Sequence, residues 1–244
     1  MTTASLSERA ARQAEVVQAL SQHVPAHALL WNAEDTTPYE CDGLTAYRQR
    51  PLVVCLPETY AQIQAVLKAC HALQVPVVAR GAGTGLSGGA MPHAMGVTLS
   101  LAKFNQILKV DAYSRTAVVQ CGVRNLAISE AAAPYGLYYA PDPSSQIACT
   151  IGGNVAENSG GVHCLKYGLT VHNVLKVKGF TIKGEPVEFG SDALDAPGYD
   201  LLAAMIGSEG MLAVVTEVTV KLIPKPQLDR KSTRLNSSHS DRPR

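Results

Sequence analysis

The sequence predicts an α+β fold of two subdomains, in which each subdomain is a small sheet flanked by helices. Residues 52–79 contain a short apolar run, a segment with apolar residues at helical spacing and a second apolar run. Together they predict a strand–helix–strand unit with a parallel strand pair. Residues 107–119 predict a hairpin, because two apolar segments flank a polar turn. Two glycine-rich segments, 80–92 and 139–161, interrupt these elements, and we expect them to meet between the subdomains.

The first 49 residues are expected to form a helical leader in front of the main domain, which spans residues 50–226. The leader contains one amphipathic helix, because apolar residues recur at helical spacing. These residues are Leu6, Ala10, Ala14, Val17 and Leu20.

The second half of the main domain continues with both helix and strand patterns. Residues 124–133 predict a helix that ends before Pro134. Two strands are expected around the turn at 183–184. A helix over 199–206 and a strand with alternating apolar residues over 214–223 follow them.

The composition changes abruptly at Gln227. Two leucines are the only large apolar residues in residues 227–244. Such a segment cannot bury enough surface to offset its chain entropy, which predicts disorder. A natural polar tail and translated adapter or vector sequence are both possible explanations, and the second is favoured because a strand runs directly into the segment.

Composition and charge exclude several classes of function. The net charge is +1 and the charged fraction 17%, so the chain has no electrostatic footprint for nucleic acid or an anionic membrane. The six cysteines contain no CxxC pair, which argues against a zinc site or a disulfide framework. No segment reaches the roughly 20 apolar residues of a membrane helix, and the amino terminus lacks the pattern of a signal peptide. We therefore expect a cytoplasmic protein with reduced thiols and a small-molecule or protein partner.

In the first glycine-rich segment, Gly83, Gly85 and Gly88 match the GxGxxG pattern of Rossmann dinucleotide-binding folds. The context excludes that fold, because the loop does not open into a helical pattern and no acidic residue follows before Asp111. No Gly-Lys-Ser/Thr follows either, which excludes a P-loop.

Two interpretations of this segment remain open. It is either a flexible surface loop or a backbone cradle, in which consecutive N–H groups converge on an anion such as a diphosphate. In the cradle, Arg80 adds positive charge, and Thr84 and Ser87 add hydroxyl donors.

The second glycine-rich segment favours the cradle. Residues 141–161 combine prolines and small hydroxyl residues with paired glycines that bracket Asn154 and Asn158. Such small residues allow close approach of a flat ring, and their neutral polar groups suit the carbonyls and nitrogens of an isoalloxazine better than a metal. A third cluster places Glu209 between Gly207 and Gly210.

In this order and spacing, the three clusters resemble the FAD domain of the vanillyl-alcohol oxidase and p-cresol methylhydroxylase superfamily. The resemblance covers residues 50–226 and rests on PVVARGAGTGLSGG, PDPSSQIACTIGGNVAENSGG and GSEGMLAVVTEVTVKLIPKP. It extends to the flavin subunits of bacterial glycolate oxidases through PYECDGLTAYRQRPLVV, CGVRNLAIS and GGVHCLKYGLTVHNVLK.

Carried over residue by residue, the resemblance implies three groups of cofactor-binding residues. The FAD diphosphate would contact Arg80, Gly81, Gly83, Thr84, Gly85 and Ser87. The flavin and its linker would contact Pro141, Asp142, Ser144, Ser145, Thr150, Gly152, Gly153, Asn154 and Asn158. The site would be closed by Glu209 and Gly210.

The resemblance also implies an activity, hydride transfer from the Cα of a short 2-hydroxy acid to flavin. Glycolate is the favoured substrate, with D-lactate and D-2-hydroxyglutarate as alternatives. FAD would be non-covalent, because Thr84 stands where relatives with covalent flavin often have histidine. Electrons would pass to other glycolate oxidase subunits, including an iron–sulfur subunit, through which the cytoplasmic protein could also reach the inner membrane.

The members of this superfamily continue past the position of Pro226 into a substrate domain, which is missing from this sequence. The second hypothesis is therefore that the chain as written is a flavin-binding module without turnover. His163, Cys164 and Lys166 are interpreted as part of the flavin pocket wall, because no carboxylate is close enough in sequence to orient the imidazole. The catalytic residues stay unassigned.

Overall fold

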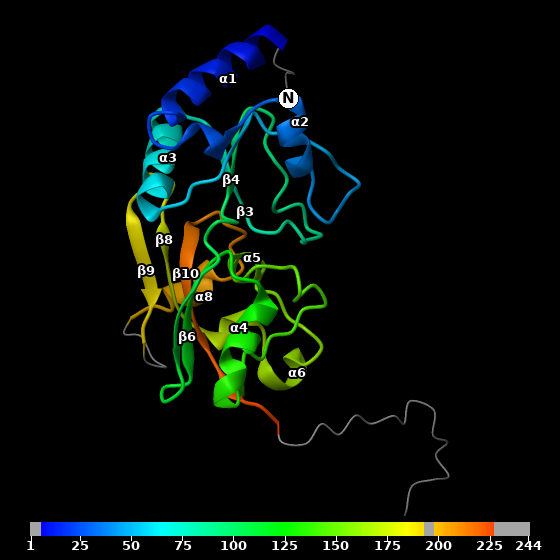
Figure 1. Ribbon diagram of the computed structural model, residues 1–244, viewed down its shortest axis with the longest axis vertical. Coiled ribbons are helices and arrows are strands. Elements are labelled where there is room, and N and C mark those ends of the chain that lie inside the picture. Colours follow the sequence, from blue (N-terminus) through cyan, green and yellow to red (C-terminus); the bar gives the residue numbers. More distant parts are fainter. Residues whose placement is uncertain (1–5, 193–197, 227–244) are drawn as a thin grey trace, which may run out of the picture.

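The computed structural model describes residues 6–192 and 198–226 and has the two-subdomain α+β fold that the sequence predicts. Figure 1 shows one sheet with its helices above and a second sheet with its helices below. The predicted disorder of residues 227–244 concerns a segment outside the described residues. No helix in the described part of the chain is long and apolar enough to cross a membrane.

The upper subdomain contains a four-stranded sheet in the order β1-β2-β4-β3. The strands β2 and β3 are both parallel to β4, which lies between them. The predicted parallel arrangement is confirmed, but direct pairing of the two strands is wrong, because the next strand in sequence inserts between them. The elements are α1 (Leu6–Leu20), β1 (Leu29–Leu30), α2 (Ala33–Thr36), β2 (Val53–Cys55), α3 (Tyr60–Ala72), β3 (Val77–Arg80) and β4 (Val97–Ser100).

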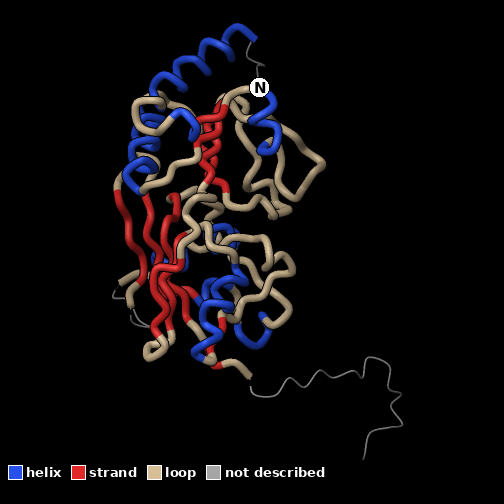
Figure 2. The backbone as a smooth tube through the Cα atoms, viewed as in Figure 1, coloured by secondary structure: helices blue, strands red, loops and turns tan. Residues whose placement is uncertain are grey.

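The lower subdomain contains a five-stranded antiparallel sheet in the order β5-β6-β10-β8-β9. Figure 2 shows helices on one side of this sheet. Both predicted hairpins are confirmed, β5–β6 and β8–β9. The strands are β5 (Ile107–Asp111), β6 (Thr116–Gln120), β7 (Leu137–Tyr138), β8 (Val174–Phe180), β9 (Pro186–Gly190), β10 (Val214–Lys221) and β11 (Ile223–Pro224). The helices are α4 (Asn125–Ala132), α5 (Ile151–Glu157), α6 (Cys164–Tyr167), α7 (Thr170–Asn173) and α8 (Leu201–Met205).

The expectation of one irregular segment over residues 139–161 is wrong, because α5 lies within it. Paired glycines disfavour a helix, but tertiary packing outweighs that preference here. A Cβ on Gly152 would come within 2.8 Å of the Cys121 Cβ, so the glycine lets α5 pack directly against the end of β6.

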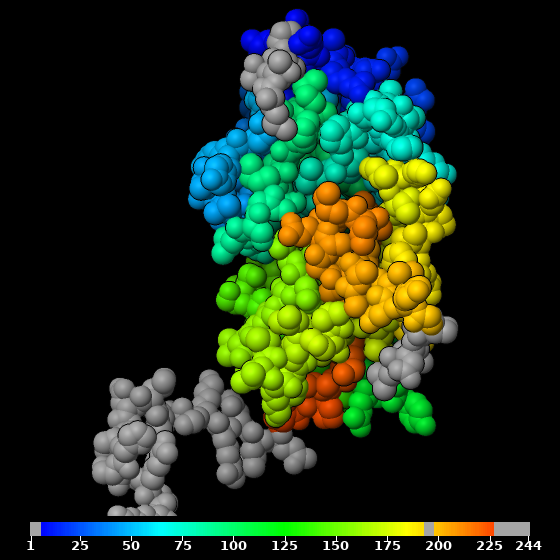
Figure 3. All heavy atoms as spheres, turned by 180° about the vertical axis from the view of Figure 1, so that it is seen from behind, coloured from blue at the N-terminus to red at the C-terminus, as the bar shows by residue number. Residues whose placement is uncertain are grey.

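The two subdomains are held together by one continuous apolar core and by specific contacts across their boundary. The Tyr60 and Phe104 rings lie 5.2 Å apart, and Gln120 donates a hydrogen bond of 3.0 Å to the Tyr60 hydroxyl. Gln64 of α3 donates to the Gly184 carbonyl at the tip of the β8–β9 hairpin, at 2.7 Å. Seen from behind in Figure 3, the orange segment after α8 lies across this boundary.

The leader is part of the upper sheet, because β1 pairs antiparallel with β2. It also supports the first glycine-rich loop. A Cβ on Gly43 would come within 2.8 Å of the carbonyl oxygens of both Thr84 and Gly85. The leader therefore packs against the loop that follows β3.

Candidate functional site

A cavity of about 370 Å³ lies where the loop after β3 meets α5 and the segment between α8 and β10. The two glycine-rich segments touch there, because a Cβ on Gly81 would collide with Thr150 Oγ1. Their expected meeting between the subdomains is thereby confirmed. The predicted residues that line the cavity are Arg80, Gly81, Gly83, Thr84, Gly85, Ser87, Ser144, Ser145, Thr150, Gly152, Gly153, Asn154, Glu209 and Gly210.

The loop after β3 presents unused backbone donors. Among the described residues, no acceptor takes a hydrogen bond from the backbone N–H groups of residues 82–89. Gly83 and Gly88 have φ values of 70° and 80°, which glycine adopts without strain. Successive N–H groups around such residues form concave sites for anions.

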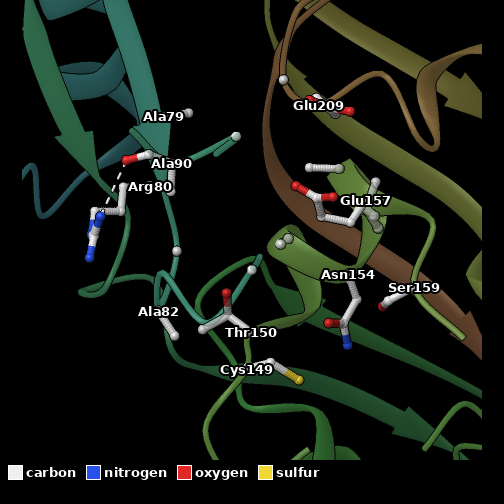
Figure 4. Close-up of a pocket in the computed structure, with 18 of the residues that line it drawn as sticks. Ala79, Arg80, Ala82, Ala90, Cys149, Thr150, Asn154, Glu157, Ser159 and Glu209 are labelled. Carbon is white, nitrogen blue, oxygen red and sulfur yellow. Dashed lines mark hydrogen bonds between the residues drawn. The ribbon is translucent and has the colours of Figure 1, made fainter. Parts of the chain in front are cut away.

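Arg80 supports this loop from beneath. Its guanidinium donates to the Ala90 carbonyl at 3.2 Å and lies 5.7 Å from the centre of the Tyr39 ring. Figure 4 shows the side chain directed away from Glu157 and Glu209. Burial lowers the pKa of Arg80 from its usual value, and the nearby Cys41 and Asp42 oppose this shift. The positive charge thus lies under the loop.

Thr150 supplies a hydroxyl without a protein partner. The residue precedes α5 at the N-cap position, but its side chain makes no capping hydrogen bond. Oγ1 is buried without a hydrogen-bond partner, and the residue is 7% exposed. Because a buried hydroxyl without a partner is costly, its position on the cavity wall indicates that a ligand satisfies it.

The opposite wall of the cavity is acidic. Ser87 donates a hydrogen bond of 2.9 Å to Glu157 Oε2. Glu209 is held beside the end of α5, since its N–H donates to the Ala156 carbonyl at 2.9 Å. Glu209 adopts φ of 52°, which is uncommon for a residue with a side chain. The carboxylates of Glu157 and Glu209 both face the backbone of Gly89.

Three predicted residues do not line the cavity and instead support its walls. The Pro141 carbonyl accepts a hydrogen bond of 2.9 Å from the buried Asn125 side chain. Asn158 ends α5 in the left-handed conformation, and its Oδ1 accepts from the Val171 N–H at 3.0 Å. The third is Asp142, which binds His163.

His163 does pair with a carboxylate, but that carboxylate lies 21 residues earlier in the sequence. Its Nδ1 lies 2.6 Å from Asp142 Oδ2, and its N–H donates to Oδ1 at 3.1 Å. His163, Cys164 and Lys166 are not among the described residues that line the cavity, so their assignment to the flavin pocket wall stays a prediction. The pair connects the segment before Ser144 to the start of α6.

Sequence reasoning missed Glu157, Cys149 and Ser159, all of which line the cavity. A signal for Glu157 was present, because it is the only Asp, Glu, Lys or Arg within residues 143–165. A lone charge inside a segment of small neutral residues marks a polar environment. Its partner Ser87 lies 70 residues away in sequence, which hides the contact.

The FAD binding domain family matches residues 51–190. Glycolate oxidase subunit GlcD of Escherichia coli strain K12 is 64% identical over 215 residues, covering 88% of this chain and 43% of that protein. The Bacillus subtilis protein of the same name is 43% identical, covering 78% of this chain and 40% of that protein. The D-lactate dehydrogenase of Anaerostipes hadrus is 37% identical, with coverages of 87% and 45%.

Solved structures give the same fold. An alkyldihydroxyacetonephosphate synthase superposes with a TM-score of 0.78 at 22% identity, covering 88% of this chain and 41% of that chain. The chain spans less than half the length of the curated relatives named above. The unused N–H groups, the Thr150 hydroxyl and the glycines that admit a close ligand all fit a flavin dinucleotide. The chain belongs to the FAD binding domain family of the p-cresol methylhydroxylase type, and its cofactor is FAD.

Proposed function

We propose that the chain is the FAD-binding portion of a flavoprotein dehydrogenase that oxidises a short 2-hydroxy acid, with glycolate as the first candidate. The proposal is carried by one observation: a cavity lined by free N–H groups and an unpartnered hydroxyl, in a chain similar to proteins named glycolate oxidase subunits. D-lactate and D-2-hydroxyglutarate are the alternative substrates, because relatives with those names are similar at lower identity.

In this proposal the backbone does most of the binding. The N–H groups at the start of the loop, residues 82–84, hold the diphosphate, and Arg80 adds its charge through the loop. Thr150 donates to the flavin or its linker, and Asn154 adds neutral polar contacts beside it. Gly152 and Gly153 leave room for a flat ring. Bound FAD supplies a hydride acceptor, and the protein supplies its position.

The domains and partners follow from the same proposal. Residues 50–226 form the FAD domain, residues 1–49 support it as a leader, and the substrate domain belongs to the portion of the relatives that this chain does not span. Electrons pass to other subunits, including an iron–sulfur subunit, in the cytoplasm. The chain by itself is a flavin-binding module without turnover, because no group that would fix a substrate carboxylate has been assigned in it.

The test is reconstitution followed by reduction. The chain freed of flavin is titrated with FAD, and binding is followed by flavin fluorescence. Glycolate is then added without oxygen, to this chain and to a version extended with the remainder of a full-length relative. We expect both to bind FAD and only the extended protein to bleach. Failure of the chain to bind FAD, or equal bleaching of both proteins, contradicts the proposal.

We also propose that FAD is held without a covalent bond. Thr84 has no nucleophile suited to flavin attachment, and burial raises the pKa of the cavity thiol Cys121 to about 12, which keeps it protonated. Acid precipitation of the reconstituted protein should leave a colourless pellet and a yellow supernatant. Yellow colour that stays in the washed pellet would refute this part.

A further inference from the structure

The charges that line the cavity are unevenly placed. Among the described residues that line it, the Asp, Glu, Lys or Arg residues are Arg80, Glu157 and Glu209. Arg80 is bonded to the loop backbone and directed away from the acidic wall, as Figure 4 shows. One wall therefore presents N–H groups without a partner among the described residues. The other presents two carboxylates, and the one lining cation in the described part of the chain, Arg80, points away from them.

Glu157 is held in a fixed orientation. Ser87 donates to Oε2, which leaves Oε1 facing the loop. A Cβ on Gly89 would come within 2.8 Å of Oε1, and a Cβ on Gly85 within 3.8 Å. The same Gly89 position lies 3.7 Å from Glu209 Oε2. A carboxylate oxygen that can accept further hydrogen bonds is thus presented beside the N–H groups of the loop.

These two walls suit different parts of one ligand. A diphosphate is repelled by carboxylates a few ångströms away, and this repulsion is strong where water is scarce. Hydroxyl groups are attracted, because they donate charge-assisted hydrogen bonds to a carboxylate. FAD contains hydroxyl groups on both sides of its diphosphate, on the ribose of its adenosine and on its ribityl chain.

We propose that Glu157 accepts hydrogen bonds from neighbouring hydroxyl groups of FAD and so sets the direction in which the dinucleotide lies in the cavity. The proposal rests on the proposed FAD site. Ser87 then acts as a positioning residue for Glu157. The buried, unpartnered Thr150 hydroxyl independently indicates that a ligand with polar groups occupies the same cavity.

The experiment measures binding, with no turnover required. The flavin-free chain is titrated with three ligands: FAD, FAD that lacks the 2′-hydroxyl of the ribose, and FAD that lacks the 2′-hydroxyl of the ribityl chain. We expect one deoxy ligand to bind roughly 10- to 100-fold more weakly than FAD, as for loss of a hydrogen bond to a charged group. The deoxy ligand that binds more weakly shows whether the hydroxyl group that Glu157 contacts belongs to the ribose or to the ribityl chain.

The variant Glu157→Gln keeps the shape of the side chain and removes its charge. It should weaken FAD binding and reduce the preference for FAD over the sensitive deoxy ligand to within about threefold. Glu130→Gln makes the same charge change on the exposed side of α4 and should keep the wild-type preference. Circular dichroism of both variants checks that they fold.

Three outcomes would overturn the inference. They are tighter FAD binding by Glu157→Gln, an unchanged preference in that variant, and equal binding of all three ligands by the wild-type chain. The first would mean that the carboxylate competes with the diphosphate for Ser87. A wild-type chain that binds none of the three ligands would instead refute the proposed FAD site itself.

Discussion

At the scale of single residues, two buried threonines differ in what surrounds their hydroxyls. Thr98 in β4 and Thr150 before α5 both have an Oγ1 without a hydrogen-bond partner. Thr150 lines the cavity and Thr98 does not. A ligand in the cavity can therefore satisfy the Thr150 hydroxyl, whereas nothing in the described structure satisfies the Thr98 hydroxyl. The first hydroxyl should favour ligand binding, and the second should only cost stability.

Replacing each threonine with valine separates these two roles. Thr150→Val should weaken FAD binding by roughly 3- to 10-fold, because one neutral hydrogen bond is lost. Thr98→Val should leave FAD binding unchanged and raise the free energy of unfolding by about 1 kcal/mol, because an unsatisfied hydroxyl is removed. Fluorescence titration and urea unfolding measure the two effects. Equal effects of both substitutions on FAD affinity would contradict the assignment of Thr150.

The buried thiols predict how stability depends on alkaline pH. Burial raises the pKa of Cys55, Cys70 and Cys121 to about 12, from about 9. The folded state therefore keeps these thiols neutral, so their contribution is fully present below pH 9 and is lost as the pH rises from 9 towards 12.

Each such thiol should lower the free energy of unfolding by up to about 1.4 kcal/mol per pH unit in that range. Urea unfolding at pH 8 and pH 10.5 measures the loss. Cys55→Ala should make the loss of unfolding free energy between these two pH values smaller. An equal loss in the wild type and in Cys55→Ala would show that other groups dominate.

Contacts between side chains far apart in sequence were the part of the site that the sequence predicted least well. The glycine pattern predicted the loop after β3, because glycine content is itself the local requirement for that backbone. Asp142 and His163 are 21 residues apart, and Ser87 and Glu157 are 70 apart. Such pairs form only when the whole fold brings their segments together, so no local pattern encodes them.

At the scale of elements, α5 shows where glycine is needed for packing and where it is not. A Cβ on Gly152 would lie 2.8 Å from the Cys121 Cβ and 3.0 Å from its carbonyl oxygen. A Cβ on Gly153 would meet only the Thr150 Oγ1, at an ordinary 3.5 Å. Both glycines have equal local cost in a helix, and only the first has a packing reason to remain.

Alanine at these positions should therefore have opposite effects. Gly152→Ala should lower the free energy of unfolding by about 1–3 kcal/mol through overpacking. Gly153→Ala should raise it by up to about 1 kcal/mol through helix propensity. Thermal unfolding without flavin measures both. The packing account fails if Gly152→Ala is as stable as the wild type.

The order of the strands in the upper sheet could not be predicted from local sequence patterns. The apolar runs predicted β2 and β3 and their parallel orientation, because a helix connects them. Nothing in the composition of the segment that forms β4 places this strand between the other two. Position within a sheet depends on which edges remain open, and that is decided by the rest of the molecule.

At the scale of the whole molecule, the two subdomains share one core. Buried residues from the upper sheet, such as Leu99, and from the lower sheet, such as Val119, belong to the same apolar cluster. Hydrogen bonds from Gln120 to Tyr60 and from Gln64 to Gly184 cross the boundary. Neither subdomain can open without exposing part of the other.

We therefore expect one cooperative unfolding transition. Trp31, the only tryptophan, directly follows β1 and reports on the upper subdomain, and amide exchange in β10 reports on the lower one. Their midpoints in urea should coincide, as two-state unfolding requires. Loss of the Trp31 signal before the β10 amides lose protection would show that the subdomains unfold separately.

Val218 of β10 pairs with Val119 on one side and Val177 on the other, so the last long strand in the described part of the chain occupies the centre of the lower sheet. On the ribosome, the two hairpins that flank it are made first and have no partner along their inner edges. Until β10 leaves the exit tunnel, those edges are open to pairing with other chains. Protease digestion of stalled nascent chains should show resistance of the lower subdomain only once β10 has emerged, and resistance at shorter lengths would disprove this order of assembly.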